Sequence, residues 1–298
     1  MPPAIGLTVE VRDPDWTDLA PMLDAASALG VDSVELPLHW LPLIRGGRVI
    51  AERVAAVRAT CADRGLRYSL HGHLGINLME EPFRVGLHTD LLKANIEVAA
   101  ELGCRHLVVH GGFVPARQAA ALDAAEAQQH RLLAEAGDIA RDHGVILCVE
   151  NIFEFEGKRI TALPGRLARQ LRAVGHPNVA ATFDISHGWL HCHQLGADFL
   201  AEAAELAPLA RHLHLHDSFG RPDDFWTYTP VEAMAFGIGD LHMPPGWGNI
   251  PWDAVAERCT WPEGLVGNLE IAPQHRSHHA EAVAAARAWV GRLRFGRD

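Results

Sequence analysis

Eight short apolar segments recur along the 298 residues, and each is followed by a segment with helical periodicity. Strands of a parallel sheet have both faces covered by other elements, so they appear as nearly continuous apolar runs. The predicted strands are 4–9, 33–38, 67–71, 105–110, 145–150, 179–183, 211–216 and 265–270. The predicted helices are 16–29, 49–64, 86–102, 116–143, 163–174, 197–206, 252–257 and 278–293.

Strict alternation of strands and helices predicts an α/β fold of the (β/α)8 TIM barrel type, with an open doubly wound sheet as the alternative. The sequence contains no linker rich in Pro, Gly or Ser, no low-complexity tract and no short repeat. We therefore expect a single domain over 1–298.

Composition indicates a packed globular protein. Hydrophobic residues make up 48% of the chain, and no apolar run approaches the length of a membrane span. The N-terminus lacks the basic and then apolar pattern of a signal peptide. The cysteines are odd in number and widely separated, at Cys61, Cys104, Cys148, Cys192 and Cys259. These features predict reduced, mainly packing cysteines and a cytoplasmic location without membrane association.

The net charge is −11 at neutral pH. Proteins that bind nucleic acid along a general surface are usually basic there, so this charge disfavours a nucleic-acid partner. A small-molecule substrate is the expected partner, and the sequence leaves open whether the chain forms a homo-oligomer.

Acidic and histidine side chains stand where the predicted strands end. The active site of a barrel of this type is built at the C-terminal ends of its strands, so these side chains should share one space. Any one of them has a structural explanation, such as a hydrogen-bonded core histidine or a strand-end ion pair. Together these strand-end side chains favour a metal site. The strand-end residues are His71, His110, Glu150, Asp184 with His187, His214 with Asp217, and Glu270, and the seventh loop adds Asp240 and His242.

The segment 182–187, Thr-Phe-Asp-Ile-Ser-His, is the clearest of these strand ends. Asp184 and His187 lie three residues apart where the chain turns from a strand into a helix. An oxygen and an imidazole ligand in this arrangement suit divalent Zn, Mn, Fe or Co. The alternative is that Asp184 is only the N-cap of the helix.

The strand-end motifs resemble those of the xylose isomerase-like barrels, which include sugar epimerases, inosose dehydratases and endonuclease IV. The resemblance runs from about His71 to Glu270. It rests on Val-Val-His110-Gly-Gly, Val-Glu150-Asn151, Phe-Asp184-Ile-Ser-His187, His214-Leu-His-Asp217, Gly-Asp240-Leu-His242 before Gly246-Trp-Gly-Asn-Ile250, and Leu-Glu270-Ile.

The resemblance implies one of two ligand sets. Isomerase-type members hold one divalent ion with residues that match Glu150, Asp184, His214 and Glu270. The endonuclease IV pattern uses a fuller set, which matches His71, His110, Glu150, Asp184, His187, His214, Asp240, His242 and Glu270. This chain has all nine residues, which implies one to three divalent metal ions per chain.

Alternation along the seventh strand places His212, His214 and His216 on one face. The family's His-x-x-Asp pattern selects His214 as the metal ligand. His216 is then expected to contact the substrate, together with Asp217 and Trp247, although packing at the rim is an alternative for Trp247. His191 and His193 are expected to face solvent or the wall of a loop.

Two reaction classes follow. With one ion, Glu150 and Glu270 would act as catalytic base and acid, and the ion would stabilise an enediolate during isomerisation or epimerisation of a small sugar, polyol or sugar phosphate. With two or three ions the same carboxylates are ligands, and hydrolysis of a phosphate ester becomes the alternative. Multinuclear iron would allow oxidative chemistry.

Departures from the endonuclease pattern favour the isomerase class. His110 is followed by Gly-Gly-Phe, and the segment after His71 has Leu74-Gly75 where a base-flipping enzyme would need an aromatic wedge. The aromatic loop 218–239 is typical of a lid over a small ligand.

Overall fold

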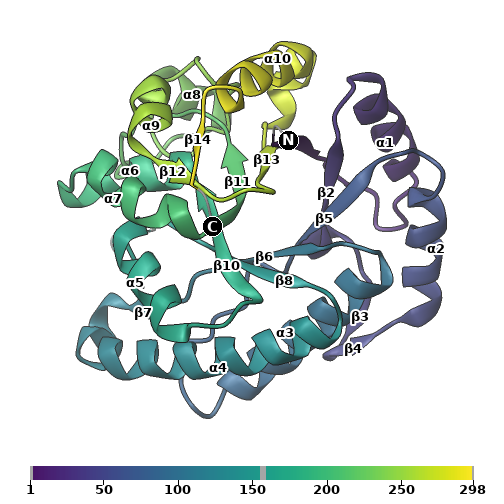
Figure 1. Cartoon of the computed structure of the whole chain (residues 1–298), viewed down its shortest axis with the longest axis horizontal. Helices are drawn as coiled ribbons and strands as arrows, with labels where there is room; N and C mark the ends of the chain where they lie inside the picture. The colour runs from purple at the N-terminus through teal and green to yellow at the C-terminus, as the bar shows by residue number, and fades with distance from the viewer. Residues whose placement is uncertain (1–2, 155–158, 297–298) are drawn as a thin grey trace.

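The computed structural model describes residues 3–154 and 159–296. Within this part of the chain eight parallel strands close into a barrel, in the order β1-β13-β11-β10-β8-β6-β5-β2 (Figure 1). Their bounds are β1 Ala4–Thr8, β2 Ser33–Pro37, β5 Arg67–His71, β6 His106–His110, β8 Ile146–Glu150, β10 Val179–Asp184, β11 Ala210–Leu215 and β13 Val266–Leu269. The prediction of a TIM barrel is confirmed.

Helices surround the barrel and cover the outer face of its sheet (Figure 1). They are α1 Leu19–Ala28, α2 Ala51–Cys61, α3 Val85–Glu101, α4 Leu122–Asp142, α5 Pro164–Val174, α6 Ile185–Leu195, α7 Phe199–Leu206, α8 Pro230–Phe236, α9 Trp252–Arg258 and α10 His279–Val290. Apart from α8, these helices contribute apolar residues that pack on the outward-facing residues of the strands to form one continuous core.

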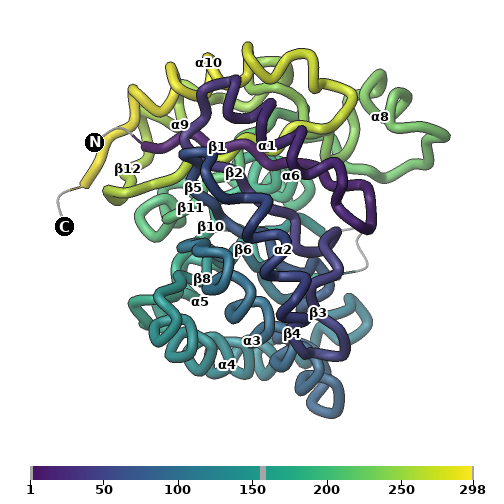
Figure 2. Tube along the Cα trace, turned by 90° about the vertical axis from the view of Figure 1, so that its right-hand side faces the viewer, coloured from purple at the N-terminus to yellow at the C-terminus, as the bar shows by residue number. Residues whose placement is uncertain are grey.

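Three short pairs of strands lie outside the barrel. They are β3 Ile44–Arg45 with β4 Arg48–Val49, β7 Val114–Pro115 with β9 Arg159–Ile160, and β12 Thr260–Trp261 with β14 Arg294–Phe295. Figure 2 shows α8 and β12 on opposite sides of the molecule. α8 belongs to the loop that follows the C-terminal end of β11, whereas β12 precedes the N-terminal end of β13.

Two predicted helices differ from the structure by three residues or more at their starts. The first begins at Leu19 rather than at Trp16, and the long fourth one begins as a 3-10 turn over Ala116–Ala121 before α4. The expected lid, residues 218–239, contains α8, which the sequence analysis did not predict. Its aromatic side chains at Phe225, Trp226 and Tyr228 are exposed.

The barrel interior is polar along one strand. His212, His214 and His216 of β11 and its C-terminal extension are all fully buried. Strand register places Asp184 beside His214, and His110 beside Glu150. The strand ends that the sequence marked as chemical therefore meet at one end of the barrel.

The described part of the chain has no helix long and apolar enough to cross a membrane. The five cysteines are buried and free, which agrees with the prediction that they pack in the interior.

Candidate metal centre

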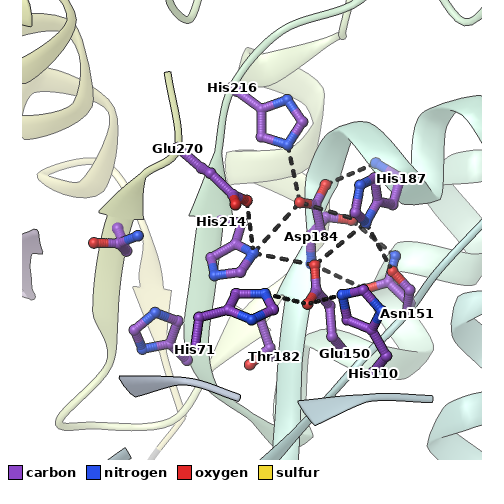
Figure 3. Close-up of polar contacts among 12 residues, drawn as sticks. His71, His110, Glu150, Asn151, Thr182, Asp184, His187, His214, His216 and Glu270 are labelled. Carbon is purple, nitrogen blue, oxygen red and sulfur yellow. Dashed lines mark hydrogen bonds and ion pairs between the residues drawn. The ribbon is translucent and has the colours of Figure 1, made fainter. Parts of the chain in front are cut away.

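Glu150, the last residue of β8, lies at the centre of a polar network at the C-terminal end of the barrel (Figure 3). Its Oε2 atom is 3.3 Å from His71 Nε2 and 3.6 Å from His110 Nε2. Its Oε1 atom is 3.3 Å from His187 Nδ1 and 3.1 Å from His214 Nδ1. One buried carboxylate thus joins imidazoles from β5, β6, α6 and β11.

Asp184 has a structural and a chemical role at once. Its Oδ1 atom accepts a hydrogen bond from the backbone N–H of His187 at 2.7 Å and so caps α6. Its Oδ2 atom faces the site, 2.9 Å from His216 Nε2 and 3.5 Å from His214 Nδ1. The side chain of Asn151 holds the backbone of Asp184 through two hydrogen bonds. The N-cap and ligand interpretations of Asp184 are therefore compatible.

A carboxylate-rich group consists of Glu150, Asp184, His214 and Glu270, each of which offers a ligand atom within 4.8 Å of the others. Three carboxylates and one imidazole match the ligand preference of Mn²⁺, Fe²⁺, Co²⁺ or Zn²⁺. Glu270 Oε2 is 3.2 Å from His214 Nδ1. The Glu270 side chain is 23% exposed, whereas the other members are buried, so solvent reaches the group on the Glu270 side.

A histidine-rich group consists of His187, His216, Asp240 and His242. Asp240 Oδ2 is 3.1 Å from His187 Nε2 and 2.7 Å from His242 Nε2, and Asp240 Oδ1 is 3.6 Å from His216 Nδ1. The rings of His216 and His242 stack with centroids 4.0 Å apart. Three imidazoles and one carboxylate form a donor set that suits Zn²⁺.

His242 adopts a backbone conformation that non-glycine residues rarely use, with φ of 45°. Its Nδ1 atom is 2.9 Å from the backbone carbonyl oxygen of Glu270, which holds the ring. Such strain is typically retained at functional sites, where the surrounding contacts enforce it.

A third set of ligand atoms that could hold an ion comprises His71, Glu150 and His214. His110 reaches the same carboxylate and packs edge-on against His71, with ring centroids 5.4 Å apart. The structure therefore brings all nine predicted ligands into one connected network, in which Glu150 and His214 belong to more than one set.

The buried carboxylates of Glu150 and Asp240 are held in their charged form. Burial alone would raise the pKa of Glu150, but the charge of His214 and the hydrogen bonds of neighbouring histidines hold it well below its usual range. The pKa of Asp240 is likewise held low, because the charges of His242, His187 and His216 outweigh its burial. Buried anions of this kind need positive charge next to them.

Histidines supply that charge when they are protonated. Burial opposes protonation of His71, yet its contact with Glu150 raises its pKa to about 9. His242 is affected in the same way by Asp240, and its pKa rises to about 10. Burial lowers the pKa of His110 to about 3, so this ring is neutral. A divalent ion would bring the same positive charge without protons, so the residues fit bound metal ions.

The structure places His216, which was expected to contact the substrate, among the candidate ligands. Its Nε2 atom contacts Asp184, and its other nitrogen and its ring face Asp240 and His242. This position favours a ligand role for His216. The alternation of His212, His214 and His216 on one face indicated this position, whereas the His-x-x-Asp pattern of the family selected only His214 as a ligand.

Asp217 is fully buried, and both oxygens of its carboxylate accept hydrogen bonds from the loop that follows. The donors are the backbone N–H groups of Ser218, Gly246 and Ile250 and the indole N–H of Trp252. This arrangement favours a structural role for Asp217 over the predicted substrate contact. It also explains Gly248 in the Gly-Trp-Gly-Asn motif, because a Cβ there would lie 2.2 Å from the Ser218 carbonyl oxygen and 2.3 Å from Asp217 Oδ1.

Trp247 packs on the C-terminal part of the chain. Its ring lies against His275 and His278, with centroids 5.4 and 4.6 Å away, and its indole N–H donates to Glu281. Among the described residues, none of these partners belongs to the ligand network. The packing alternative for Trp247 therefore agrees better with the structure than a substrate contact does.

Two further buried residues were missed or misplaced by sequence reasoning. Glu35 of β2 is fully buried inside the barrel, 3.2 Å from His214 Nε2 and 3.0 Å from His212 Nε2. An acidic residue in the middle of an apolar strand was the available signal. His191 was expected to face solvent or the wall of a loop, but it lies on the buried side of α6.

Comparison with known proteins places this geometry in context. The family model for the xylose isomerase-like TIM barrel matches residues 23–259. An uncharacterized protein of Methanocaldococcus jannaschii, MJ1311, is 26% identical over 172 residues, which is 58% of this chain and 52% of that protein. The chain thus matches about half the length of this curated relative.

Several solved structures share the fold over nearly their whole length. A D-tagatose 3-epimerase-like protein is 18% identical with a TM-score of 0.72, and the match covers 96% of this chain and 97% of that one. A D-psicose 3-epimerase in the presence of D-fructose is 16% identical with a TM-score of 0.66, and the match covers 97% of each chain. The TTHB071 protein from Thermus thermophilus, soaked with ZnCl2, is 21% identical with a TM-score of 0.64, and the match covers 99% of this chain and 100% of that one.

Proposed function

The chain belongs to the xylose isomerase-like TIM barrel family, and from that membership we propose that it is a divalent-metal-dependent isomerase or epimerase of a small sugar, polyol or sugar phosphate. The observation that carries the proposal is a pair of carboxylates, Glu150 and Glu270, which face the same nitrogen of His214 at 3.1 and 3.2 Å. The names of the epimerases among the structural neighbours support the same class of reaction.

In this proposal Glu150, Asp184, His214 and Glu270 hold the ion. A bound divalent ion would polarise a substrate carbonyl and stabilise negative charge on its oxygen. The protein's own contribution is to move a proton at the carbon beside that carbonyl. Glu270 is the group suited to reach the substrate, because it is the partly exposed member of the set.

Glu150 has the complementary position. It is buried, it contacts His71, His110, His187 and His214, and its pKa is held low by the charge of His214 and the hydrogen bonds around it. A carboxylate that is fixed on so many sides holds its neighbours in place and remains charged. Glu150 can receive a proton only if a substrate displaces one of these contacts. We therefore assign the transfer of the substrate proton to Glu270, and we place Glu150 as a fixed, charged side chain on the opposite wall of the pocket.

The test is exchange of substrate hydrogen with solvent. Metal-loaded protein is incubated in D2O with a panel of ketoses and aldoses that includes D-tagatose, D-psicose, D-fructose and L-ribulose, and loss of the proton beside the carbonyl is followed by NMR. We expect exchange with at least one sugar, and a fall of about 10²–10⁴-fold in Glu270→Gln. The control is Glu257→Gln, an exposed glutamate on α9, which should leave the rate unchanged. Absence of exchange on every sugar would refute the proposal.

A second candidate function is hydrolysis of phosphate esters by a multinuclear centre. The histidine-rich group favours it, because a single-ion isomerase has no need for the close contacts of Asp240 with His187 and His242. Bis-p-nitrophenyl phosphate and an abasic-site duplex are suitable probes. Metal-dependent cleavage of either that is lost in Asp240→Asn would favour hydrolysis, whereas sugar exchange that survives in Asp240→Asn would favour the isomerase.

A further inference from the structure

A cavity opens at the end of the barrel opposite the metal-competent residues, where the strands begin. Its volume is about 460 Å³, and it is lined by the starts of β2, β5, β6 and β11 and by the turn before β13. The metal-competent residues lie at the C-terminal ends of the same strands. The cavity is therefore separate from the site described above and needs its own explanation.

Three arginines surround this cavity, namely Arg67 of β5, Arg105 immediately before β6 and Arg211 of β11. Arg211 donates a hydrogen bond to the backbone carbonyl oxygen of Glu263 at 2.9 Å. In the described part of the chain neither Arg67 nor Arg105 has a carboxylate within ion-pair distance, whereas Arg64, at the end of the preceding helix, pairs with Asp24 at 2.9 Å. Positive charge thus gathers at one mouth of a protein whose net charge is −11.

Glu263 is the one carboxylate among the residues that line the cavity. Glu263 is exposed, and Arg211 donates its hydrogen bond to the backbone carbonyl oxygen of Glu263 rather than to the carboxylate. Three guanidinium groups against one carboxylate leave a net positive cavity, which favours an anionic ligand.

Two buried polar groups, Ser33 and His106, line the cavity beside the arginines. The hydroxyl of Ser33 is buried without a hydrogen-bond partner among the described residues. His106 is 7% exposed, and its Nδ1 atom is 3.4 Å from His212 Nδ1. Burial and the charges of His212, Arg105 and Arg211 lower the pKa of His106 to about 3, so this ring is neutral in a positive field.

We propose that the N-terminal mouth of the barrel binds a phosphate-type oxyanion, either inorganic phosphate or a phosphate monoester, between Arg67, Arg105 and Arg211. Guanidinium groups are planar forks that match the oxygens of phosphate.

The surroundings leave room for the organic part of a monoester. A neighbouring cavity of about 500 Å³ shares the lining residues Arg105, Ile146 and Pro177 with the first, so the two cavities lie next to each other. Its other walls come from the ends of α3 and α4, at Gly103 and His143 among others. The organic substituent of a phosphate that the arginines hold can therefore extend toward the neighbouring cavity.

The experiment is calorimetric titration of the metal-loaded full chain with inorganic phosphate and, separately, with glycerol 3-phosphate, which has no carbonyl. We expect a site whose affinity falls about tenfold or more in Arg67→Gln/Arg105→Gln. The control is Arg169→Gln, an exposed arginine on α5. Tighter binding of glycerol 3-phosphate than of phosphate would identify a monoester as the ligand, and equal affinities would identify the phosphate group alone as the recognised part.

Phosphate can also bind at metal ions, and the variants separate the two locations. The arginine substitutions should not affect phosphate that binds at the metal centre. A phosphate affinity that is unchanged in the double variant would therefore overturn the proposal. The absence of phosphate binding by the wild type would overturn it as well. If the double variant does not fold, the wild type labelled with ¹⁵N-arginine gives the answer. Phosphate should then shift the side-chain Nε–H signals of Arg67 and Arg105, and unshifted signals would contradict the proposal.

Discussion

Glu35 and His214 meet across the interior of the barrel, with Glu35 Oε1 3.2 Å from His214 Nε2. The other ring nitrogen of His214 faces Glu150 and Glu270. The imidazole of His214 is thus fixed between Glu35 on one side and the carboxylates of Glu150 and Glu270 on the other. A carboxylate behind a metal-ligating histidine fixes the orientation of the ring and raises its basicity as a ligand.

Replacement of Glu35 by Gln should weaken metal binding without removing a ligand. Loss of a carboxylate behind a ligating histidine typically costs 10- to 100-fold in metal affinity, and we expect an effect of about this size here. Competition with a chromophoric chelator measures the affinity for Zn²⁺. Glu257→Gln is the control, and an affinity of Glu35→Gln that equals that of the control would show that Glu35 does not act on His214.

Asp240→Asn should change the number of bound ions rather than abolish binding. Asp240 contributes the carboxylate of the histidine-rich group and has no place in the carboxylate-rich group. We expect the variant to keep the ion at Glu150, Asp184, His214 and Glu270 and to lose any ion held by His187, His216 and His242. Equilibrium dialysis followed by elemental analysis gives the count. Equal metal content in wild type and variant would mean that the histidine-rich group holds no ion.

His191→Leu should stabilise the protein, and more so in acid. Both ring nitrogens of His191 are buried without hydrogen-bond partners among the described residues, and burial together with the charge of His187 lowers its pKa to about 4. Between the ordinary histidine pKa of 6.5 and about 4, the unfolded chain takes up a proton that the folded chain does not. His191 therefore costs stability that increases as the pH falls through this window.

The expected gain from His191→Leu is about 1–3 kcal/mol, because an apolar side chain of similar size removes an unsatisfied polar group. Urea unfolding at pH 7.5 and at pH 5 measures it, and the gain should be larger at pH 5. His143→Leu, at an exposed position, is the control. A loss of stability at both pH values would show that the His191 ring has a polar function in the folded protein.

Gly248→Ala should destabilise the loop that surrounds Asp217. The added Cβ would lie 2.2 Å from the Ser218 carbonyl oxygen, so the backbone must move and the hydrogen bonds to Asp217 must lengthen. We expect a loss of about 2–4 kcal/mol in the free energy of unfolding. Gly75→Ala is the matched control, because nothing lies within 4 Å of a Cβ at Gly75. Equal unfolding midpoints for the two variants would contradict the structural role that we assign to this close approach.

The barrel was predictable because its signal is local. Each strand is an apolar run that ends in a turn. β5 has its predicted bounds, Arg67–His71, and α5, Pro164–Val174, begins one residue after its predicted start. α8 has no buried residues, so no apolar periodicity in the sequence indicates this helix. The start of the first helix was shifted because Trp16 has a positive φ of 46° and stands in the turn before α1.

The metal-competent residues were predictable for a related reason. Closure of the barrel brings strand ends together, so side chains at those ends converge without further information. Glu35 lies inside the barrel rather than at a strand end, and its contact with His214 depends on which strands face each other across the interior. The environments of Asp217 and Trp247 depend on loop packing, which strand periodicity does not encode.

Metal content per chain tests the central claim most directly, and it is measured by elemental analysis of protein purified without chelator. We predict about one or more ions of Mn, Fe, Co or Zn per chain, reduced by at least about half in Asp184→Asn, a substitution that keeps a good N-cap for α6. A folded wild-type chain that carries no such ion, and that binds none when Mn²⁺, Co²⁺, Fe²⁺ or Zn²⁺ is added, would contradict the claim that Glu150, Asp184, His214 and Glu270 form a metal centre.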